Sequence, residues 1–331
     1  NAGETHRRRF ALRLGLLKSR RNAMHNPGAP LLPEVCVKKT PRRTANVGSG
    51  HRTAVDPVMC GIAGFIAGRT WGTSEELSEI AGAMNGSLQY RGPDDGGVWI
   101  DAEAGVAFAH RRLSIIDLAG GHQPMSDREE SVWVVFNGEI YNYQELIPEL
   151  AHLGHRFRTR SDTEVLVHAY EEWGTRFPER LRGMFAFAIY DRPRGRLFLA
   201  RDRFGEKPLF VKAEANALFF ASEIKALLEH PDIGKRPDDE ILGIYLSWGV
   251  QDHSARTMFD GIFQLEPAHA LIVTKNGIHP PYQYWDVTIN RAVRSETPDP
   301  QEKDHFLDLL RDATRIHLRS DVAVGTCLSG G

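Results

Sequence analysis

Cysteine is scarce in this 331-residue chain, which contains only Cys36, Cys60 and Cys327. An odd and sparse set argues against a disulfide framework and suits a reducing compartment. Long apolar runs are missing too, because no stretch approaches the ~20 residues that a helix needs to cross a bilayer. We therefore expect a cytoplasmic globular protein with no membrane contact, in which each cysteine is a candidate reagent.

Acidic residues are nearly absent from the first part of the chain. Residues 1–58 hold 12 Lys+Arg and 3 Asp+Glu, whereas the remaining residues hold 29 and 40. The basic segment shows no sustained helix or strand period. It could be a nucleic-acid-binding arm, although interleaved aromatics are lacking, or an Arg-rich transit peptide, or sequence that precedes a true start at Met59. We favour the third interpretation. It predicts that residues 1–59 are a leader outside the mature protein, and that no nucleic acid is bound.

The rest of the chain alternates between strand-like and helix-like patterns. Thr73–Glu76 reads as a capping box before a helix with one apolar face. Helices are also expected over 143–153 and 163–173, and Pro148 predicts a kink or an early end of the first. This order favours an α+β fold with two stacked sheets and outer helices. The predicted strands cover residues 62–66, 98–100, 106–109, 132–136, 184–190, 197–200 and 218–221.

Cys60 is the strongest candidate for a chemical role. A thiol is a good nucleophile once it is deprotonated, but it needs a base. If Met59 is the initiator and is removed, Cys60 becomes the first residue and carries a free α-amine. Such an amine has a pKa near ~8 and can take and return the proton without a histidine partner. A small buried cysteine at the head of a strand is the alternative.

The motif Asn137–Asn142 follows the predicted strand over 132–136. Attack on a carboxamide passes through an oxyanion, which the amide of Asn137 and the N–H of Gly138 could stabilise. The alternative is a plain hairpin turn, since Asn-Gly is a common hairpin signal.

Three charged residues suit an amino-acid substrate. Arg112 could grip a carboxylate, and Glu139 and Asp162 could hold an ammonium group. Taken singly, each could instead be a solvated charge, and Asp162 could be a helix N-cap.

Beyond residue 300 the pattern changes. We expect an amphipathic helix from Gln301, an apolar strand over 322–328 and the turn Ser329-Gly330-Gly331. A glycine-rich turn after a strand can present N–H groups to phosphates, although many surface turns have this composition.

The motifs and their order resemble those of one family, the class II (N-terminal-nucleophile) glutamine amidotransferases of the asparagine synthetase type. The resemblance runs from Met59 to Gly331. The motifs that carry it are Met59-Cys60-Gly61-Ile62-Ala63-Gly64, Arg91-Gly92-Pro93-Asp94, Arg112-Leu113-Ser114-Ile115-Ile116-Asp117, Asn137-Gly138-Glu139-Ile140-Tyr141-Asn142, Ser161-Asp162-Thr163-Glu164, Gly183-Met184-Phe185-Ala186-Phe187, Arg201-Asp202-Arg203-Phe204-Gly205, Ala221-Ser222-Glu223-Ile224-Lys225 and Leu328-Ser329-Gly330-Gly331.

The resemblance implies an αββα sandwich of the N-terminal-nucleophile hydrolase type, followed by the truncated start of an α/β ATP-pyrophosphatase domain. The implied ranges are 60–237 for the glutaminase domain, 238–299 for a connecting region and 300–331 for the synthetase start. The implied roles are Cys60 as nucleophile, Asn137 and Gly138 as oxyanion hole, and Leu328, Ser329, Gly330 and Gly331 as ATP contacts. Glutamine would be bound by Arg112, the segment Leu113, Ser114, Ile115 and Ile116, together with Asn137, Gly138, Glu139 and Asp162.

The implied activity is that of a glutamine-hydrolysing ligase. Ammonia released at Cys60 would attack aspartate that ATP and Mg²⁺ have activated in the C-terminal domain, while the glutaminase domain needs no cofactor or metal. Glutamine, aspartate and ATP are the expected partners, and a homodimer is compatible with this interpretation. A related amidotransferase acting on a sugar, peptide or antibiotic is the nearest alternative. An inactive piece with a basic leader is another.

Overall fold

The structure, a computed structural model, describes residues 37–38, 59–67, 72–214, 217–288 and 300–326. The chain divides into a unit of Asn1–Pro57 with Ser320–Gly331 and a unit of Val58–Arg319. In the described part of the first, β1 (Val37–Lys38) pairs antiparallel with β15 (Gly325–Thr326). Most of the predicted leader, the predicted ATP contacts Leu328–Gly331, and Cys36 and Cys327 lie outside the described residues.

The second unit contains two antiparallel sheets. The six-stranded sheet has the order β11-β9-β10-β2-β4-β3, and the seven-stranded sheet has the order β13-β12-β8-β7-β6-β5, with β14 paired to β12. The strands of the first sheet are β2 (Gly61–Ala67), β3 (Asp95–Asp101), β4 (Val106–Arg112), β9 (Phe210–Ala213), β10 (Ala217–Ala221) and β11 (Ile262–Gln264). Those of the second are β5 (Met125–Ser126), β6 (Val132–Ile140), β7 (Gly183–Asp191), β8 (Arg196–Arg201), β12 (His269–Thr274), β13 (Gly277–Ile278) and β14 (Tyr282–Gln283).

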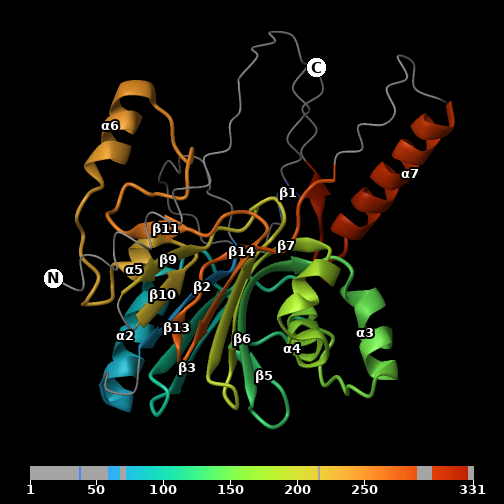
Figure 1. The fold of residues 1–331 in the computed structure, drawn as a ribbon. Helices are drawn as coiled ribbons and strands as arrows, with labels where there is room; N and C mark the ends of the chain where they lie inside the picture. The colour runs from blue at the N-terminus through green and yellow to red at the C-terminus, as the bar shows by residue number, and fades with distance from the viewer. Residues whose placement is uncertain (1–36, 39–58, 68–71, 215–216, 289–299, 327–331) are drawn as a thin grey trace, which may run out of the picture. The chain divides into compact units, whose positions relative to one another are not determined.

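Helices cover the outer faces of both sheets. Figure 1 shows α2 on one side of the sheets and α3 and α4 on the other. No helix among the described residues is both long and apolar enough to cross a membrane. The helices are α2 (Ser74–Ser87), α3 (Tyr143–His152), α4 (Asp162–Trp173), the 3₁₀ helix η1 (Gly174–Arg180), α5 (Ile224–Leu227), α6 (Asp239–Trp248) and α7 (Pro300–His317).

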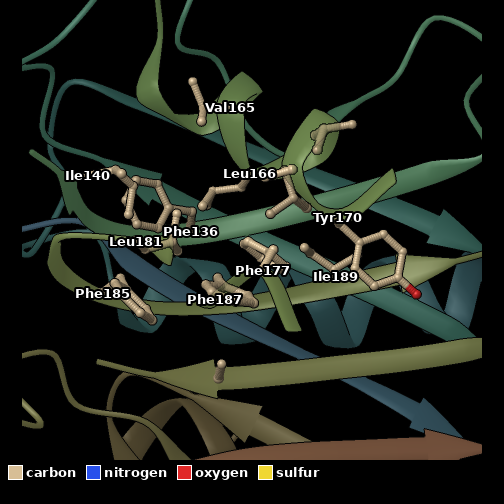
Figure 2. Close-up of a cluster of buried hydrophobic side chains, with 14 of the residues drawn as sticks. Phe136, Ile140, Val165, Leu166, Tyr170, Phe177, Leu181, Phe185, Phe187 and Ile189 are labelled. Carbon is tan, nitrogen blue, oxygen red and sulfur yellow. The ribbon is translucent and has the colours of Figure 1, made fainter. Parts of the chain in front are cut away.

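Three apolar cores hold these layers together. Alternating side chains point to opposite faces of a strand, so a sheet buried on both sides supplies two cores. In β2, Ile62 packs between the two sheets, while Phe65 packs under α2 and α5. The third core lies between the seven-stranded sheet and α3, α4 and η1, where Phe177 and Phe187 stack beneath Leu166 and Tyr170 (Figure 2). The α+β prediction is confirmed, and the layers follow the order helix, sheet, sheet, helix.

Most predicted elements recur, with several differences. Of the strand expected over 322–328, the described residues 322–326 form a strand only at β15 (Gly325–Thr326). The capping box is present, since Thr73 Oγ1 accepts from Glu76 N–H (3.3 Å) and Glu76 Oε2 accepts from Thr73 N–H (2.7 Å). Helix α3 runs through Pro148 rather than ending early. Strand β6 continues to Ile140 instead of stopping at Phe136, because β7 pairs with its whole length. Strands β11 to β14 come from the range predicted as a connecting region (238–299), and they extend both sheets.

Candidate active site

Cys60 directly precedes β2, and its thiol faces the segment that follows β4. The Leu113 N–H donates to Cys60 Sγ at 3.3 Å, and the thiol donates to the Leu113 carbonyl at 3.6 Å. Antiparallel pairing of Gly61 with Arg111 places these two segments side by side. The sheet register therefore fixes the position of the sulfur.

Burial governs the titration of this thiol. It raises the pKa of Cys60 above its ordinary value, against the opposing effects of the Leu113 N–H and the positive charges of Lys207 and Arg112. A protonated thiol is a poor nucleophile. A base would therefore be needed for the partly buried Cys60 thiol to attack a substrate.

The Arg91–Asp94 loop anchors the backbone around Cys60. Arg91 Nε donates to the Cys60 carbonyl (3.0 Å), and its Nη1 pairs with Glu223 at 2.7 Å. Asp94 accepts from the Ser114 N–H at 2.8 Å. A Cβ on Gly92 would approach the Arg111–Arg112 backbone to 2.3 Å, so only glycine fits there. This loop joins the backbone of Cys60 to the segment that contacts its sulfur.

The side chain of Arg112 is buried and lies against its own following loop. Its Nη2 donates to the carbonyls of Ile116 (2.9 Å) and Asp117 (2.6 Å), and its Nη1 donates to that of Leu118 (3.1 Å). The guanidinium thus holds the Leu113–Ile116 segment in a closed turn. Within that turn Leu113 and Ile116 are buried, while Ser114 and Ile115 are partly exposed.

Asn137 and Gly138 lie inside β6, opposite Ala186 and Phe185 of β7. The hairpin alternative is therefore wrong at this position. Asn137 is buried, and its side-chain amide lies 3.5 Å from Ser222 Oγ, which accepts from the Ile62 N–H at 3.0 Å. A Cβ on Gly138 would approach the Met184 carbonyl to 2.1 Å, which explains the glycine. Ser222 links the amide of Asn137 to the strand that carries Cys60.

Two buried carboxylates flank the end of β6. Asp162, the first residue of α4, accepts from the Ile140 N–H at 3.0 Å, while Ser161 is the N-cap, so the N-cap alternative for Asp162 is wrong. Burial, aided by the charge of Glu139, raises the pKa of Asp162 to about 7 against the lowering effect of backbone hydrogen bonds. Asp162 is also within electrostatic range of Cys60.

Lys207 is a charged neighbour that the sequence patterns did not single out. It is buried, and its Nζ donates to Met59 Sδ at 3.0 Å. Burial lowers its pKa, and the charges of Glu139 and Cys60 act against that shift. The Arg201–Gly205 motif holds the backbone of Lys207 in place. The Asp202 carboxylate accepts from Lys207 N–H (2.9 Å), and Arg201 Nε donates to the Lys207 carbonyl (2.8 Å).

These contacts gather most of the predicted glutaminase residues at one place. Cys60, Arg112 and Leu113 meet at the end of the β2–β4 pair where β2 begins and β4 ends. Asp162 lies in electrostatic range of Cys60. The contributions of Arg91, Lys207, Ser222 and Glu223 were missed, although three of them fall inside quoted motifs. Their contacts connect segments up to 160 residues apart, so a linear pattern gives no signal for them.

Comparison with known proteins gives a consistent result. A profile of the glutamine amidotransferase domain matches residues 59–285. The chain is 40% identical over 275 residues to glutamine-hydrolysing asparagine synthetase 3 of Bacillus subtilis, covering 82% of this chain and 44% of that protein. It is 39% identical over 281 residues to asparagine synthetase 2 of the same organism, covering 82% and 37%. The chain therefore spans less than half the length of these curated relatives.

A solved structure of an allosteric regulatory enzyme of purine biosynthesis shares the fold. Its TM-score is 0.51 at 21% identity, and the match covers 70% of this chain and 50% of that one. The profile match spans well over half of the chain and includes Cys60 and every described residue of the candidate site. The chain belongs to the glutamine amidotransferase domain family, of the asparagine synthetase type.

Proposed function

We propose that Cys60 hydrolyses the side-chain amide of glutamine to give glutamate and ammonia. The observation that carries this proposal is the partly buried Cys60 thiol, which accepts from the Leu113 N–H and has Arg112 and Asp162 in electrostatic range. Membership of the amidotransferase family supports the same chemistry.

The reaction proceeds in two acyl-transfer steps. The Cys60 thiolate attacks the amide carbon, and the oxyanion that forms is stabilised by the Asn137 amide and the Gly138 N–H. The C–N bond breaks, the nitrogen takes a proton and leaves as ammonia, and a thioester remains on Cys60. Water then attacks the thioester, which releases glutamate and restores the thiol.

The substrate's other groups are assigned by charge. Glu139 and Asp162 would bind the ammonium, whose positive charge favours the ionised form of Asp162. The Leu113–Ile116 segment would contact the glutamine backbone, and Arg112 would act by holding that segment in its turn. Arg112 would also bind the carboxylate of glutamine, because a guanidinium has five N–H donors and can contact a substrate as well as its own loop.

The base in this proposal is the α-amine of Cys60. It exists only when Met59 and all residues before it have been removed, so residues 1–59 would be absent from the active protein. Its pKa near ~8 suits proton exchange with the thiol at neutral pH.

The activity of the whole protein is a further part of the proposal. A synthetase domain beginning near residue 300, after the glutaminase domain (60–237) and connecting region (238–299), would use the ammonia to amidate aspartate activated by ATP and Mg²⁺. The proposed ATP contacts, Leu328–Gly331, lie outside the described residues. The curated relatives' name supports asparagine as the product.

The test compares ammonia release from glutamine by three chains. A chain that begins at Met59 should be active after Met59 is removed, as checked by mass spectrometry. The same chain with Cys60→Ala should lose at least ~10³-fold in kcat, since no nucleophile remains. The full 331-residue chain, if its leader stays attached, should be inactive. Equal rates for the first two chains would contradict the proposal.

A further inference from the structure

A second cluster of reactive side chains lies on α4, apart from the contacts that surround Cys60. It consists of His155, which follows α3, and His168 and Glu171 of α4. One ligand atom from each lies within 4.8 Å of the others. We propose that these three residues bind a divalent transition-metal ion of the zinc type.

The distances within the cluster suit such an ion. The Nδ1 atoms of His155 and His168 both face the same carboxylate oxygen, Glu171 Oε2, at 3.4 and 2.8 Å. Zinc bonds of about 2.0–2.2 Å in a tetrahedron separate neighbouring ligand atoms by ~3.3 Å. The His155–Glu171 distance already matches this separation, while Glu171 would have to move away from His168 by about half an ångström.

Both imidazoles are backed by a second carboxylate on their far side. His155 Nε2 lies 3.2 Å from Glu172 Oε2, and His168 Nε2 lies 3.7 Å from Glu164 Oε1. His168 is buried, and its Nε2 has no hydrogen-bond partner within the part of the chain that is described. Protons on the two Nε2 atoms would leave both Nδ1 lone pairs on the side that faces Glu171. This carboxylate–histidine arrangement orients imidazoles at metal sites.

The surrounding charges favour a cation. Glu164, Glu171 and Glu172 supply three carboxylates, and Arg158, whose Nε lies 3.7 Å from Glu164, offsets one of them. An ion pair between His168 and its neighbouring carboxylates accounts for His168 without a metal. His155 has carboxylate partners of its own in Glu172 and Glu171, so in the absence of a metal both imidazoles are held by carboxylates. The proposed ion would take the place of the contacts that both Nδ1 atoms make with Glu171 Oε2.

One coordination position of the ion would remain open to solvent. The side chains of Glu171 and Glu172 are 27% and 34% exposed, whereas that of His168 is 11% exposed. Three protein ligands with a water in the fourth position is a common zinc arrangement. The site does not depend on the proposed glutaminase activity, so each can fail without the other.

Equilibrium dialysis of the 331-residue chain against Zn²⁺ tests the proposal, and Co²⁺ provides a visible spectrum of the ligand field. We expect one ion per chain at this cluster, and affinity lower by ~10-fold or more in His155→Gln and in Glu171→Gln. These two positions are partly exposed, so both variants should fold, which thermal unfolding would check. His152→Gln, an exposed histidine of α3, and Cys60→Ala should bind as the wild type does. Absence of stoichiometric binding, or binding that His155→Gln and Glu171→Gln leave unchanged, would overturn the proposal.

Discussion

Lys207 places a buried positive charge next to Met59, the residue before the proposed nucleophile Cys60. Its Nζ contacts Met59, and its charge also acts on Cys60. In a chain that begins at Cys60, this ammonium would disfavour a second positive charge on the nearby α-amine. We expect the amine to be neutral at a lower pH than an ordinary terminal amine, which suits it as a base.

Lys207→Met should therefore weaken catalysis and change its pH dependence. Without the positive charge, the pKa values of the amine and of the thiol should rise, so the acidic limb of kcat/KM should move up by about one pH unit. The rate at pH 7 should fall about ten-fold, and stability should fall as well, because the buried Glu139 carboxylate loses a favourable charge interaction. Lys235→Met, at an exposed position, is the control. An unchanged pH profile would argue against this role.

Asp162→Asn should make the stability of the protein less sensitive to pH. The pKa of Asp162 is raised from 3.8 to about 7, so the folded state binds this proton more tightly than the unfolded state does. Wild-type stability should then fall as the pH rises from 4 to 7, at up to ~1.4 kcal/mol per pH unit. Asparagine cannot ionise and still accepts from Ile140.

Urea unfolding at pH 5 and at pH 8 would measure this effect. The stability gained by Asp162→Asn over the wild type should widen toward pH 8, by a few kcal/mol at most. Asp304→Asn, at an exposed position of α7, should show no such trend. A constant difference across the range would contradict the raised pKa. The same variant should bind glutamine poorly if Asp162 holds the ammonium.

Individual residues show where sequence reasoning succeeds and where it stops. Local motifs with a chemical reason single out Cys60 and Asp162 as candidates, and the structure places the two in electrostatic range of each other, while their roles stay predictions. The direction of the Arg112 guanidinium could not be predicted from the sequence, since it depends on the path of the loop over 116–118. The contact between Ser222 and Asn137 crosses from one sheet to the other, and no local pattern encodes such a contact.

At the scale of secondary structure, β7 contributes Phe187 to the apolar core that also contains residues of α4 and η1. Phe187 is fully buried there, against Phe177 and Phe198, as Figure 2 shows for the first pair. Phe187→Ala should cost about 3–5 kcal/mol in the free energy of unfolding. Phe204→Ala is a matched control, because that ring is 70% exposed and should cost far less. Similar losses for the two variants would contradict the layer arrangement.

Long periodic elements were predictable, and short edge strands were not. Helix α2 has a capping box and a regular apolar face, so its limits follow from its own sequence. Strands β11, β13 and β14 have two or three residues each and exist because a neighbouring strand offers its edge. The strand propensity of their residues is too weak to identify them in the sequence, since tertiary pairing decides whether such segments become strands.

At the scale of the whole molecule, residues 262–283 complete both sheets. Ile262 lies in the core under α2, while Leu265 and Leu271 lie in the core between the sheets. A chain limited to 59–237 would lack these side chains and leave β8 and β9 with open edges. We expect it to unfold at a much lower temperature than a chain over 59–319, or to aggregate, because exposed edges promote association.

Calorimetry on the two chains would check this expectation. The longer chain should show one cooperative transition for the sandwich, with the shorter chain at least ~10 °C lower or without a transition. Equal melting temperatures would mean that 60–237 is a domain that folds alone.

The position of Asn137 and Gly138 within β6 limits how this family can vary in length. Inserting one residue in the paired stretch of β6 before Asn137 would turn its amide to the other face of the sheet, away from Ser222. The turn over 192–195, at the other end of the β7–β8 pair, carries no such constraint. Functional relatives should therefore tolerate insertions in that turn, while the stretch from Val132 to Gly138 should keep its length in every active member.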